Sequence, residues 1–306
     1  MPHISSKEIL LDARARHYGV GNMLASDIEM ATGFCRAAED LCSPVILCVN
    51  TEVNPQIPLE VGIPLIVKAA EACKSPVATI LDHGHKFEDI AKSIELGLNT
   101  VMFDGSLLSF EENVKKTKEV VEYAHARGVC VEGELGCITG SAVEAYSSSA
   151  KAVFTEPEKA IEFVDRTGVD QLAISFGNAH GFYKGKPELD LARVKELLNA
   201  VEIPLVMHGA SGLEYKEYPR IVEAGISKIN YYSALSKRAV SEISVCMRDQ
   251  NKTGYHNFVE CAVNTFYSQM KFLMRLFGSV GATVDSLDDL SDLLTKEVLD
   301  FLGKNT

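Results

Sequence analysis

Residues 95–104 read ELGLNTVMFD, and this short stretch contains the end of a helix, a turn and a buried strand. The apolar run Thr100–Phe103 is typical of a strand, and Gly97 suits the left-handed residue at which many helices stop. The same order of helix, glycine and strand returns in EAGISKIN at residues 223–230. This repetition predicts a chain in which helices and strands alternate.

On both sides of these stretches, short runs rich in Val, Ile and Leu recur along the chain. Such runs are expected of parallel strands that are buried on both faces. The predicted strands are Gly19–Leu24, Pro44–Val49, Pro76–Leu81, Thr100–Phe103, Val129–Leu135, Gln171–Ser175, Pro204–Met207 and Ser227–Asn230. Amphipathic stretches predict helices at Ser26–Leu41, Leu59–Cys73, Phe87–Leu96, Phe110–Ala126, Glu156–Arg166, Leu189–Ala200, Tyr218–Glu223 and Ala234–Arg248. Helix stops are expected at Gly97, Gly128, Gly168 and Gly225. The alternation predicts an α/β fold, a (β/α)₈ TIM barrel, with a doubly wound sheet as the structural alternative.

No Pro-, Gly- or Ser-rich linker divides the chain, so we expect a single domain over residues 1–306. Beyond Arg248, a polar turn precedes two more predicted helices, at about residues 256–276 and 286–302. We expect this C-terminal segment, about residues 249–306, to be extra helical structure that packs outside the barrel or forms an oligomer contact. The low-complexity patch Ser147–Lys151 predicts a loop over the barrel mouth.

Composition narrows the class of protein. A formal net charge of −12 argues against nucleic-acid binding, which leaves a basic footprint. No apolar run reaches the roughly 18 residues that a membrane span needs, and the N-terminus lacks the apolar core of a signal peptide. The eight cysteines contain no C-x-x-C pair. We therefore expect reduced, buried thiols, such as Cys35, Cys48, Cys73 and Cys130, in a cytoplasmic protein, with a disulfide framework as the alternative.

Chemically capable side chains follow the predicted strands. They are Asp82, His83, Asp104, Glu134, His180, His208, Asn230 and Ser233. Active sites of (β/α)₈ barrels lie at the carboxyl ends of the strands and draw groups from several of them. The sequence therefore predicts an active site at that face.

Three of these residues are histidines, His83, His180 and His208, which follow the third, sixth and seventh strands. Neutral imidazole is a good ligand for zinc, and three protein ligands leave a position open for substrate. We therefore expect a divalent-metal site, whereas a histidine taken alone is more often a structural residue. His85 is a candidate for the rim of the mouth, and His125 is expected on a helix surface.

Small residues follow the seventh strand in the order Gly209, Ala210, Ser211, Gly212. Such a loop exposes backbone N–H groups to an anion, and a serine hydroxyl adds a donor. The loops after the seventh and eighth strands are the recurrent phosphate site of this fold. The pattern favours a phosphate cradle, with an ordinary turn as the alternative.

Five motifs together resemble one known family. They are LDHG at 81–84, EGELG at 132–136, AHGFYKGKPELD at 179–190, LVMHGASG at 205–212 and KIN at 228–230. In combination they are similar to the class II, zinc-dependent fructose-bisphosphate/tagatose-bisphosphate aldolases, from about residue 5 to Gly281. The resemblance implies an aldehyde-lyase of carbohydrate metabolism that reversibly cleaves a ketose (bis)phosphate to dihydroxyacetone phosphate and an aldehyde. It also implies Zn²⁺ or another divalent metal, a monovalent cation, and a homodimer or homotetramer.

The resemblance also carries residue roles. His83, His180 and His208 match the family's zinc ligands, and Asp104 and Glu134 match acids near an alternative metal position. Asp82 matches the catalytic acid that exchanges a proton with the aldehyde oxygen. The positions that match phosphate-binding residues are Gly181, Lys184, Gly209, Ser211, Asn230 and Ser233.

Three departures from the family pattern lie away from the phosphate side. Met23 and Leu24 stand where the family usually has Phe-Asn, with Asn22 slightly displaced, and Asn50 replaces a serine or threonine. In the loop after Glu134, Glu144 is the nearest acid, displaced from the expected position. We expect an intact dihydroxyacetone-phosphate half-site and an altered aldehyde half-site, so that a non-standard aldehyde is produced.

Three alternatives remain at this point. A Schiff-base aldolase needs a lysine in the barrel mouth, for which Lys228 is a weak candidate. A metal-dependent hydrolase on the same barrel is another, although its usual H-x-H near the first strand is absent and His83-Gly-His85 follows the third. The third is a catalytically altered family member that binds sugar phosphates as a sensor.

Overall fold

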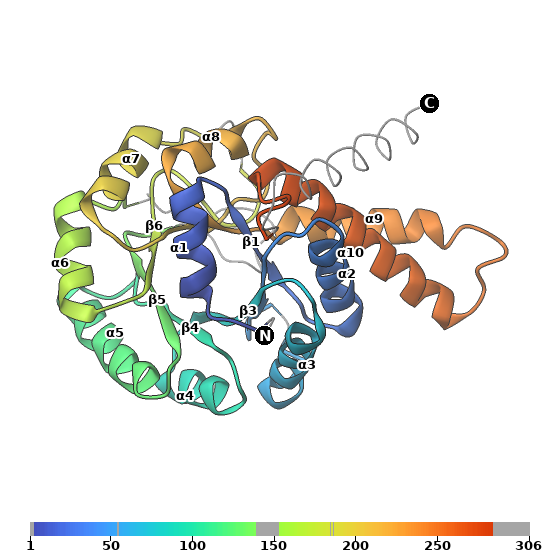
Figure 1. Ribbon diagram of the computed structural model, residues 1–306, viewed down its shortest axis with the longest axis horizontal. Coiled ribbons are helices and arrows are strands. Elements are labelled where there is room, and N and C mark those ends of the chain that lie inside the picture. The colour runs from blue at the N-terminus through green and yellow to red at the C-terminus, as the bar shows by residue number, and fades with distance from the viewer. Residues whose placement is uncertain (1–2, 54, 139–152, 184, 186, 284–306) are drawn as a thin grey trace.

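The computed structural model describes residues 3–53, 55–138, 153–183, 185 and 187–283. Eight parallel strands pair in chain order and close into a barrel, because β1 also pairs with β8 (Figure 1). The strands are β1 (Val20–Leu24), β2 (Val45–Val49), β3 (Val77–Gly84), β4 (Thr100–Phe103), β5 (Cys130–Leu135), β6 (Gln171–Ile174), β7 (Leu205–Met207) and β8 (Ile226–Asn230). The predicted (β/α)₈ barrel is confirmed, and the doubly wound alternative is wrong because that sheet would have open edges.

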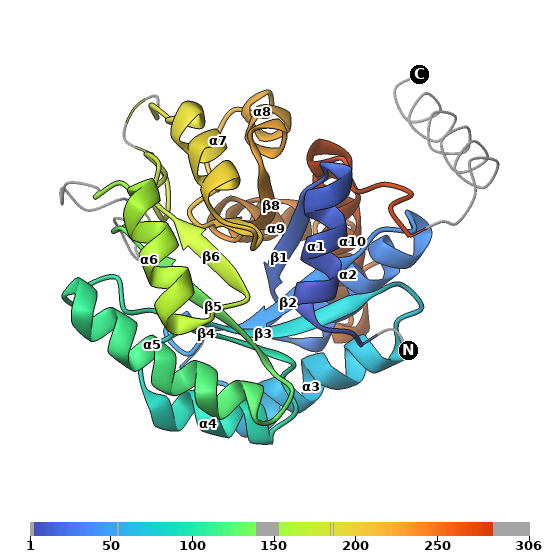
Figure 2. The same cartoon turned by 60° about the vertical axis from the view of Figure 1, so that its left-hand side comes forward.

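The helices are α1 (Ser6–Arg16), α2 (Ile28–Asp40), α3 (Leu59–Ala72), α4 (Phe87–Glu95), α5 (Phe110–His125), α6 (Pro157–Thr167), α7 (Leu191–Ala200), α8 (Glu217–Ala224), α9 (Ser233–Cys246) and α10 (Tyr255–Phe277). Figure 2 shows them surrounding the strands. The expected stops are confirmed, since Gly97, Gly128, Gly168 and Gly225 all have positive φ. Among the described residues, no helix is both long and apolar enough to cross a membrane.

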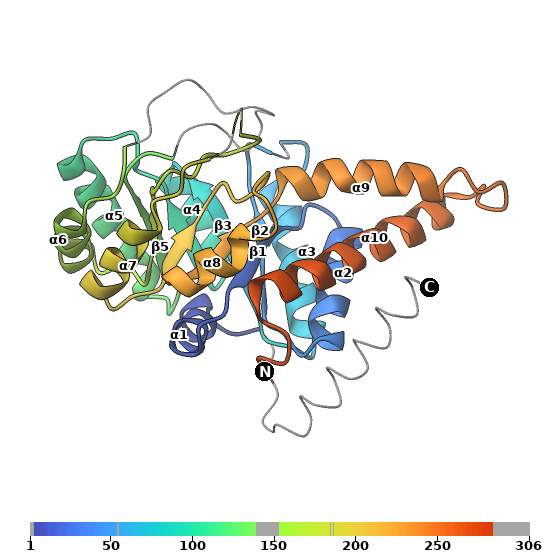
Figure 3. The same cartoon turned by 90° about the horizontal axis from the view of Figure 1, so that it is seen from above.

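Apolar side chains form two clusters. One fills the space between the strands and the surrounding helices. The other fills the barrel interior, where Val20, Ile46 and Ile80 meet Leu10 of α1. The sequence analysis missed α1, which contacts β1, β3 and β8 and closes the end of the barrel opposite α9 (Figure 3). The floor of the barrel is therefore apolar, and the polar strand ends lie at the other end.

The helices α9 and α10 form a hairpin that projects from the barrel (Figures 1 and 3). The far part of α10 returns to the barrel and contacts α2, α8 and β1. It thus occupies the place in the helical ring between α8 and α2. The predicted helical structure beyond Arg248 is therefore present, and α10 packs against the barrel. The second predicted C-terminal helix, at about 286–302, lies outside the described residues.

The hairpin also corrects the expectation about cysteines. Cys246 at the end of α9 is disulfide-bonded to Cys261 on α10. Cys35, Cys48, Cys73 and Cys130 are free and buried, as expected. The paired cysteines are 15 positions apart in the sequence, and only the antiparallel arrangement of the two helices brings them together.

Candidate active site

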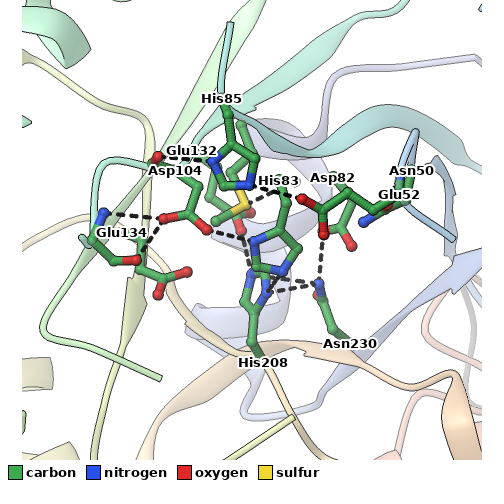
Figure 4. Close-up of polar contacts among 12 residues, drawn as sticks. Asn50, Glu52, Asp82, His83, His85, Asp104, Glu132, Glu134, His208 and Asn230 are labelled. Carbon is green, nitrogen blue, oxygen red and sulfur yellow. Dashed lines mark hydrogen bonds and ion pairs between the residues drawn. The ribbon is translucent and has the colours of Figure 1, made fainter. Parts of the chain in front are cut away.

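A pocket of about 470 Å³ opens at the carboxyl ends of the strands. It is lined by Asn22, Leu24, Cys48, Asn50, Val53, Asp82, His83, His180, Gly181, His208, Gly209, Ser211, Asn230, Tyr231, Tyr232 and Ser233. Most of the residues predicted from the sequence therefore lie together. Figure 4 shows the polar contacts on one side of this pocket.

A bulge at the end of β3 brings Asp82 and His83 into the same pocket. Successive strand residues point to opposite faces, so a regular strand would direct one of them away. Here Leu81 pairs with Val101 but Gly84 pairs with Phe103, which leaves one extra residue on β3. His83 accommodates the extra residue of the bulge by adopting φ 53°, a left-handed backbone conformation that is costly for a residue other than glycine. The strain is located at a residue whose side chain the site uses.

The other two histidines come from β6 and β7. His208 follows β7 directly, is fully buried, and its Nδ1 lies 3.0 Å from His83 Nε2. His180 lies in the loop after β6. The side chain of Asn178 holds this loop by accepting from Phe176 N and donating to His208 O. Possible ligand atoms of the three imidazoles lie within 4.8 Å of one another.

The contacts of these rings fit a metal ion. Both ring nitrogens of His180 are buried and have no hydrogen-bond partner among the described residues. A buried polar atom without a partner is unfavourable, and a cation at the centre of the cluster would supply one. Burial and the neighbouring imidazoles His83 and His208 lower the pKa of His180, so its ring is neutral, as a metal ligand requires.

A second cluster of possible ligands shares His83 and adds the two acids predicted for an alternative position, Asp104 and Glu134. Asp104 Oδ2 lies 2.8 Å from His83 Nδ1, and its Oδ1 accepts from Ser106. Burial raises the pKa of Glu134 well above its usual range, and the charge of Asp104 adds to this effect. Burial alone would lower the pKa of His83, but Asp82 and Asp104 outweigh it and raise that pKa to about 10, so a metal ion bound at His83 would displace its proton.

Asp82 is held beside the histidines by β8. Its Oδ1 accepts a hydrogen bond from Asn230 Nδ2 at 2.9 Å, and the same amide nitrogen lies 3.3 Å from His208 Nδ1. Asn230 Oδ1 is buried and, within the described part of the chain, has no hydrogen-bond partner. A carboxylate fixed in this way at the pocket wall is placed to exchange a proton with a bound molecule.

The predicted phosphate side is formed by the loops after β6, β7 and β8. Gly209 has φ 67°, and a Cβ on it would lie 2.2 Å from Ala179 O, so only glycine fits this turn. Ser211 Oγ accepts from the backbone N–H groups of Tyr232 and Ala234 at the start of α9. Gly181 and Ser233 complete this wall of the pocket. Small residues beside a helix N-terminus are suited to an anion.

The opposite wall contains the positions at which the sequence departs from the family pattern. Asn22, Leu24 and Asn50 line the pocket, whereas Met23 belongs to the core outside the barrel. Asn50 Oδ1 accepts from the backbone N–H groups of Glu52 and Val53, and its buried Nδ2 has no partner among the residues that the structure describes. Within the same described ranges, both amide atoms of Asn22 are also buried and unpaired. This wall offers amide groups to a ligand.

Some predicted residues lie elsewhere. Lys184, Glu144 and the loop Ser147–Lys151 lie outside the described residues. His125 is on α5, where its Nε2 contacts Asp170. His85 is outside the metal-ligand clusters formed by the described residues, with Nδ1 3.3 Å from Asp104 O, so the paired histidines of a hydrolase site are not formed.

Lys228 does not suit a Schiff-base enzyme. It is fully buried beneath the pocket, where its Nζ donates to Glu132 Oε2 at 2.7 Å. An amine held in a buried ion pair has neither the free lone pair nor the access that attack on a carbonyl needs. No role was predicted for Glu132 from the sequence, although an acid inside the buried strand EGELG indicates a buried partner.

Comparisons with known proteins identify the family of this chain. The model of the class II fructose-bisphosphate aldolase family matches residues 4–282. A sulfofructosephosphate aldolase of Alkalicoccus urumqiensis is 37% identical over 281 residues, covering 91% of this chain and 98% of that protein. A fructose-bisphosphate aldolase of Staphylococcus aureus is 37% identical over 236 residues, covering 75% and 81%. The crystal structure of the YdjI aldolase from Escherichia coli K12 has a TM-score of 0.81 at 33% identity, covering 91% and 98%. The chain belongs to the class II fructose-bisphosphate aldolase family and is a lyase that performs retro-aldol cleavage.

Proposed function

We propose that His83, His180 and His208 hold a divalent ion, zinc in the resting enzyme, and that Asp82 moves the proton of the retro-aldol step. The observation that carries this proposal is the convergence of three imidazoles within 4.8 Å beside Asp82 at the pocket wall. When bound, the ion would supply a Lewis acid for the negative charge that develops on the ketose fragment. The monovalent cation expected from the family stays a prediction.

Asp82 acts at the oxygen that becomes the aldehyde. In cleavage, the bond between the carbon next to the ketone and the following, hydroxyl-bearing carbon breaks. Its electron pair passes to the ketone-bearing fragment, and the hydroxyl on the leaving fragment loses its proton and becomes the aldehyde carbonyl. The Asp82 carboxylate accepts the proton, and Asn230 holds it in place by donating to Oδ1. In condensation, the protonated Asp82 returns the proton to the same oxygen.

The substrate is a ketose phosphate whose phosphate lies against Gly181, Gly209, Ser211 and Ser233. Asn230 belongs to this wall as well as to the proton-transfer group, and Lys184 stays a prediction because it lies outside the described residues. Two relatives of similar identity are named for different substrates, a sulfofructose phosphate and a fructose bisphosphate. Both names contain a phosphate, so the variable part is the aldehyde end.

We propose that the aldehyde differs from that of the ordinary sugar bisphosphates, because Leu24 and Asn50 replace the family residues on that wall. The test is a metal-replete screen of dihydroxyacetone phosphate release from fructose and tagatose 1,6-bisphosphates and from ketose 1-phosphates, with Asp82→Asn as the matched inactive control. We expect faster release from a 1-phosphate. A strong preference for fructose 1,6-bisphosphate would defeat this idea. Absence of release from every ketose would favour the sugar-phosphate sensor.

We further propose one barrel domain that assembles as a homodimer or homotetramer in the cytoplasm. The α9–α10 hairpin carries exposed apolar residues, among them Val240 and Val245 on α9 and Tyr255 on α10. Apolar side chains gathered on a projecting element are typical of a contact between subunits. Light scattering of the wild type and of Val240→Lys tests this, and a wild-type monomer at micromolar concentration would refute it.

A further inference from the structure

A buried ion pair lies beneath the pocket, and the proposed mechanism does not use it. Lys228 Nζ on β8 donates to Glu132 Oε2 on β5 at 2.7 Å, and both side chains are fully buried. Burying two charges is expensive, and an apolar pair of similar volume is often at least as stable. A contribution to folding stability therefore does not explain why Glu132 and Lys228 occupy these buried positions.

Glu132 joins this pair to the proposed metal site. Its other oxygen, Oε1, lies 2.8 Å from His208 Nε2, while His208 Nδ1 faces His83 Nε2 at 3.0 Å. A carboxylate accepts hydrogen bonds only, so the proton of the neutral His208 ring sits on Nε2 and the lone pair on Nδ1. Glu132 therefore selects the tautomer that turns a ligand atom toward the cluster.

Further hydrogen bonds fix Glu132 from the floor of the barrel. Gln171 Nε2 on β6 donates to Glu132 Oε2. Ser6 on α1 donates to Gln171 Oε1 at 2.8 Å, and Thr100 on β4 donates to Ser6 Oγ at 2.8 Å. A continuous chain of buried hydrogen bonds thus runs from α1 to His208. The position of the carboxylate is set by donors on two strands besides the histidine.

We propose that Glu132 is a positioning residue for His208, that Lys228 and Gln171 hold its carboxylate in place, and that this buried chain sets the affinity of the metal site. The inference rests on the proposed role of His208 as a ligand. Carboxylates that accept from the second nitrogen of a ligating histidine fix the ring and raise its basicity. The role differs from catalysis, because Glu132 and Lys228 lie outside the pocket lining.

The experiment compares Glu132→Gln, Lys228→Met, the double variant and Thr79→Val. In Glu132→Gln alone, an uncharged amide must face the Lys228 ammonium, and folding can fail. The double variant removes both charges and avoids this problem. Thr79→Val is the matched control, because Thr79 is fully buried and its side chain bonds His3, while within the described part of the chain that side chain makes no hydrogen bond to Glu132, Gln171 or His208. Zn²⁺ affinity is measured by competition with a chromogenic chelator, and the visible spectrum of the Co²⁺-loaded protein reports ligand geometry.

We expect the folded double variant to bind Zn²⁺ about 10–100-fold more weakly than wild type and to have a changed Co²⁺ spectrum. Thr79→Val should lose stability while keeping both metal readouts. A folded double variant with wild-type affinity and spectrum would overturn the inference. His208→Ala separates the two proposals: if it binds Zn²⁺ as wild type does, the proposed metal site fails. If only His208→Ala loses the ion, the metal site stands and the role of Glu132 fails.

Discussion

Replacing Asp82 by Asn removes the proposed proton acceptor while leaving the pocket almost unchanged. The asparagine side chain has the same shape, and its oxygen can still accept from Asn230 Nδ2 as Asp82 Oδ1 does at 2.9 Å. General acid–base catalysis contributes roughly 10²–10⁴-fold in rate, which corresponds to about 3–5 kcal/mol of barrier. We therefore expect kcat for dihydroxyacetone phosphate release to fall by about that factor.

The metal content of the variant distinguishes proton transfer by Asp82 from a role in positioning the metal ligands. Among the hydrogen bonds of the described residues, Asp82 is bonded to Asn230 and to no histidine ring. The variant should therefore retain its metal content by elemental analysis and its substrate KM within about threefold. Glu52→Gln is the matched control, because it removes another carboxylate near the mouth, one that lies 3.5 Å from His85 and is half exposed. A decrease in kcat of less than tenfold would refute the proposed role of Asp82 in proton transfer. A loss of metal that parallels the loss of activity would also refute it.

Three further predictions concern residues that support the site or the barrel, namely Tyr183, Gly209 and Gly33. Burial raises the pKa of Tyr183 to about 12, so its contribution to stability is complete below pH 10 and is lost as pH rises through 12. The free energy of unfolding of Tyr183→Phe should therefore lack a pH-dependent component of up to about 3 kcal/mol that wild type shows over this window. Gly209→Ala would place its Cβ 2.2 Å from Ala179 O, and we expect a KM for the ketose phosphate raised at least about tenfold, with an unchanged KM counting against the phosphate cradle. Gly33→Ala would place a Cβ 2.8 Å from Phe266 Cβ where α2 meets α10, and denaturant unfolding should show a loss of about 1–3 kcal/mol with activity per folded molecule retained.

Much of the fold was predictable because parallel strands are buried on both faces. Runs such as Thr100–Phe103 are then continuous and apolar, and the observed β4 has the predicted bounds. The helix α1 was missed because it buries few apolar residues, among them Ile9 and Leu10, so its sequence shows weak periodicity. The place of α10 in the ring depends on contacts with α2 and α8 that no local pattern encodes.

The candidate site was predictable to the level of which residues meet. His83, His208 and Asp82 directly follow strands predicted from the sequence, and the closed barrel brings their side chains to one pocket. The bulge that directs both Asp82 and His83 inward was not visible in the sequence, because a one-residue register shift leaves the apolar pattern of β3 intact. The pairing of Glu132 with Lys228 depends on which residues face each other across the barrel interior.

The central claim is a divalent ion held by three histidines, and metal analysis of a ligand variant tests it most directly. Wild type, His180→Ala and the control His125→Ala are loaded with Zn²⁺ and freed of excess metal. Bound zinc and dihydroxyacetone phosphate release are then measured, with and without chelator. The account predicts about one tightly held ion per chain in wild type and His125→Ala, its loss in His180→Ala, and activity that follows the ion. Full activity in metal-free wild type, together with borohydride trapping of substrate on Lys228, would contradict it.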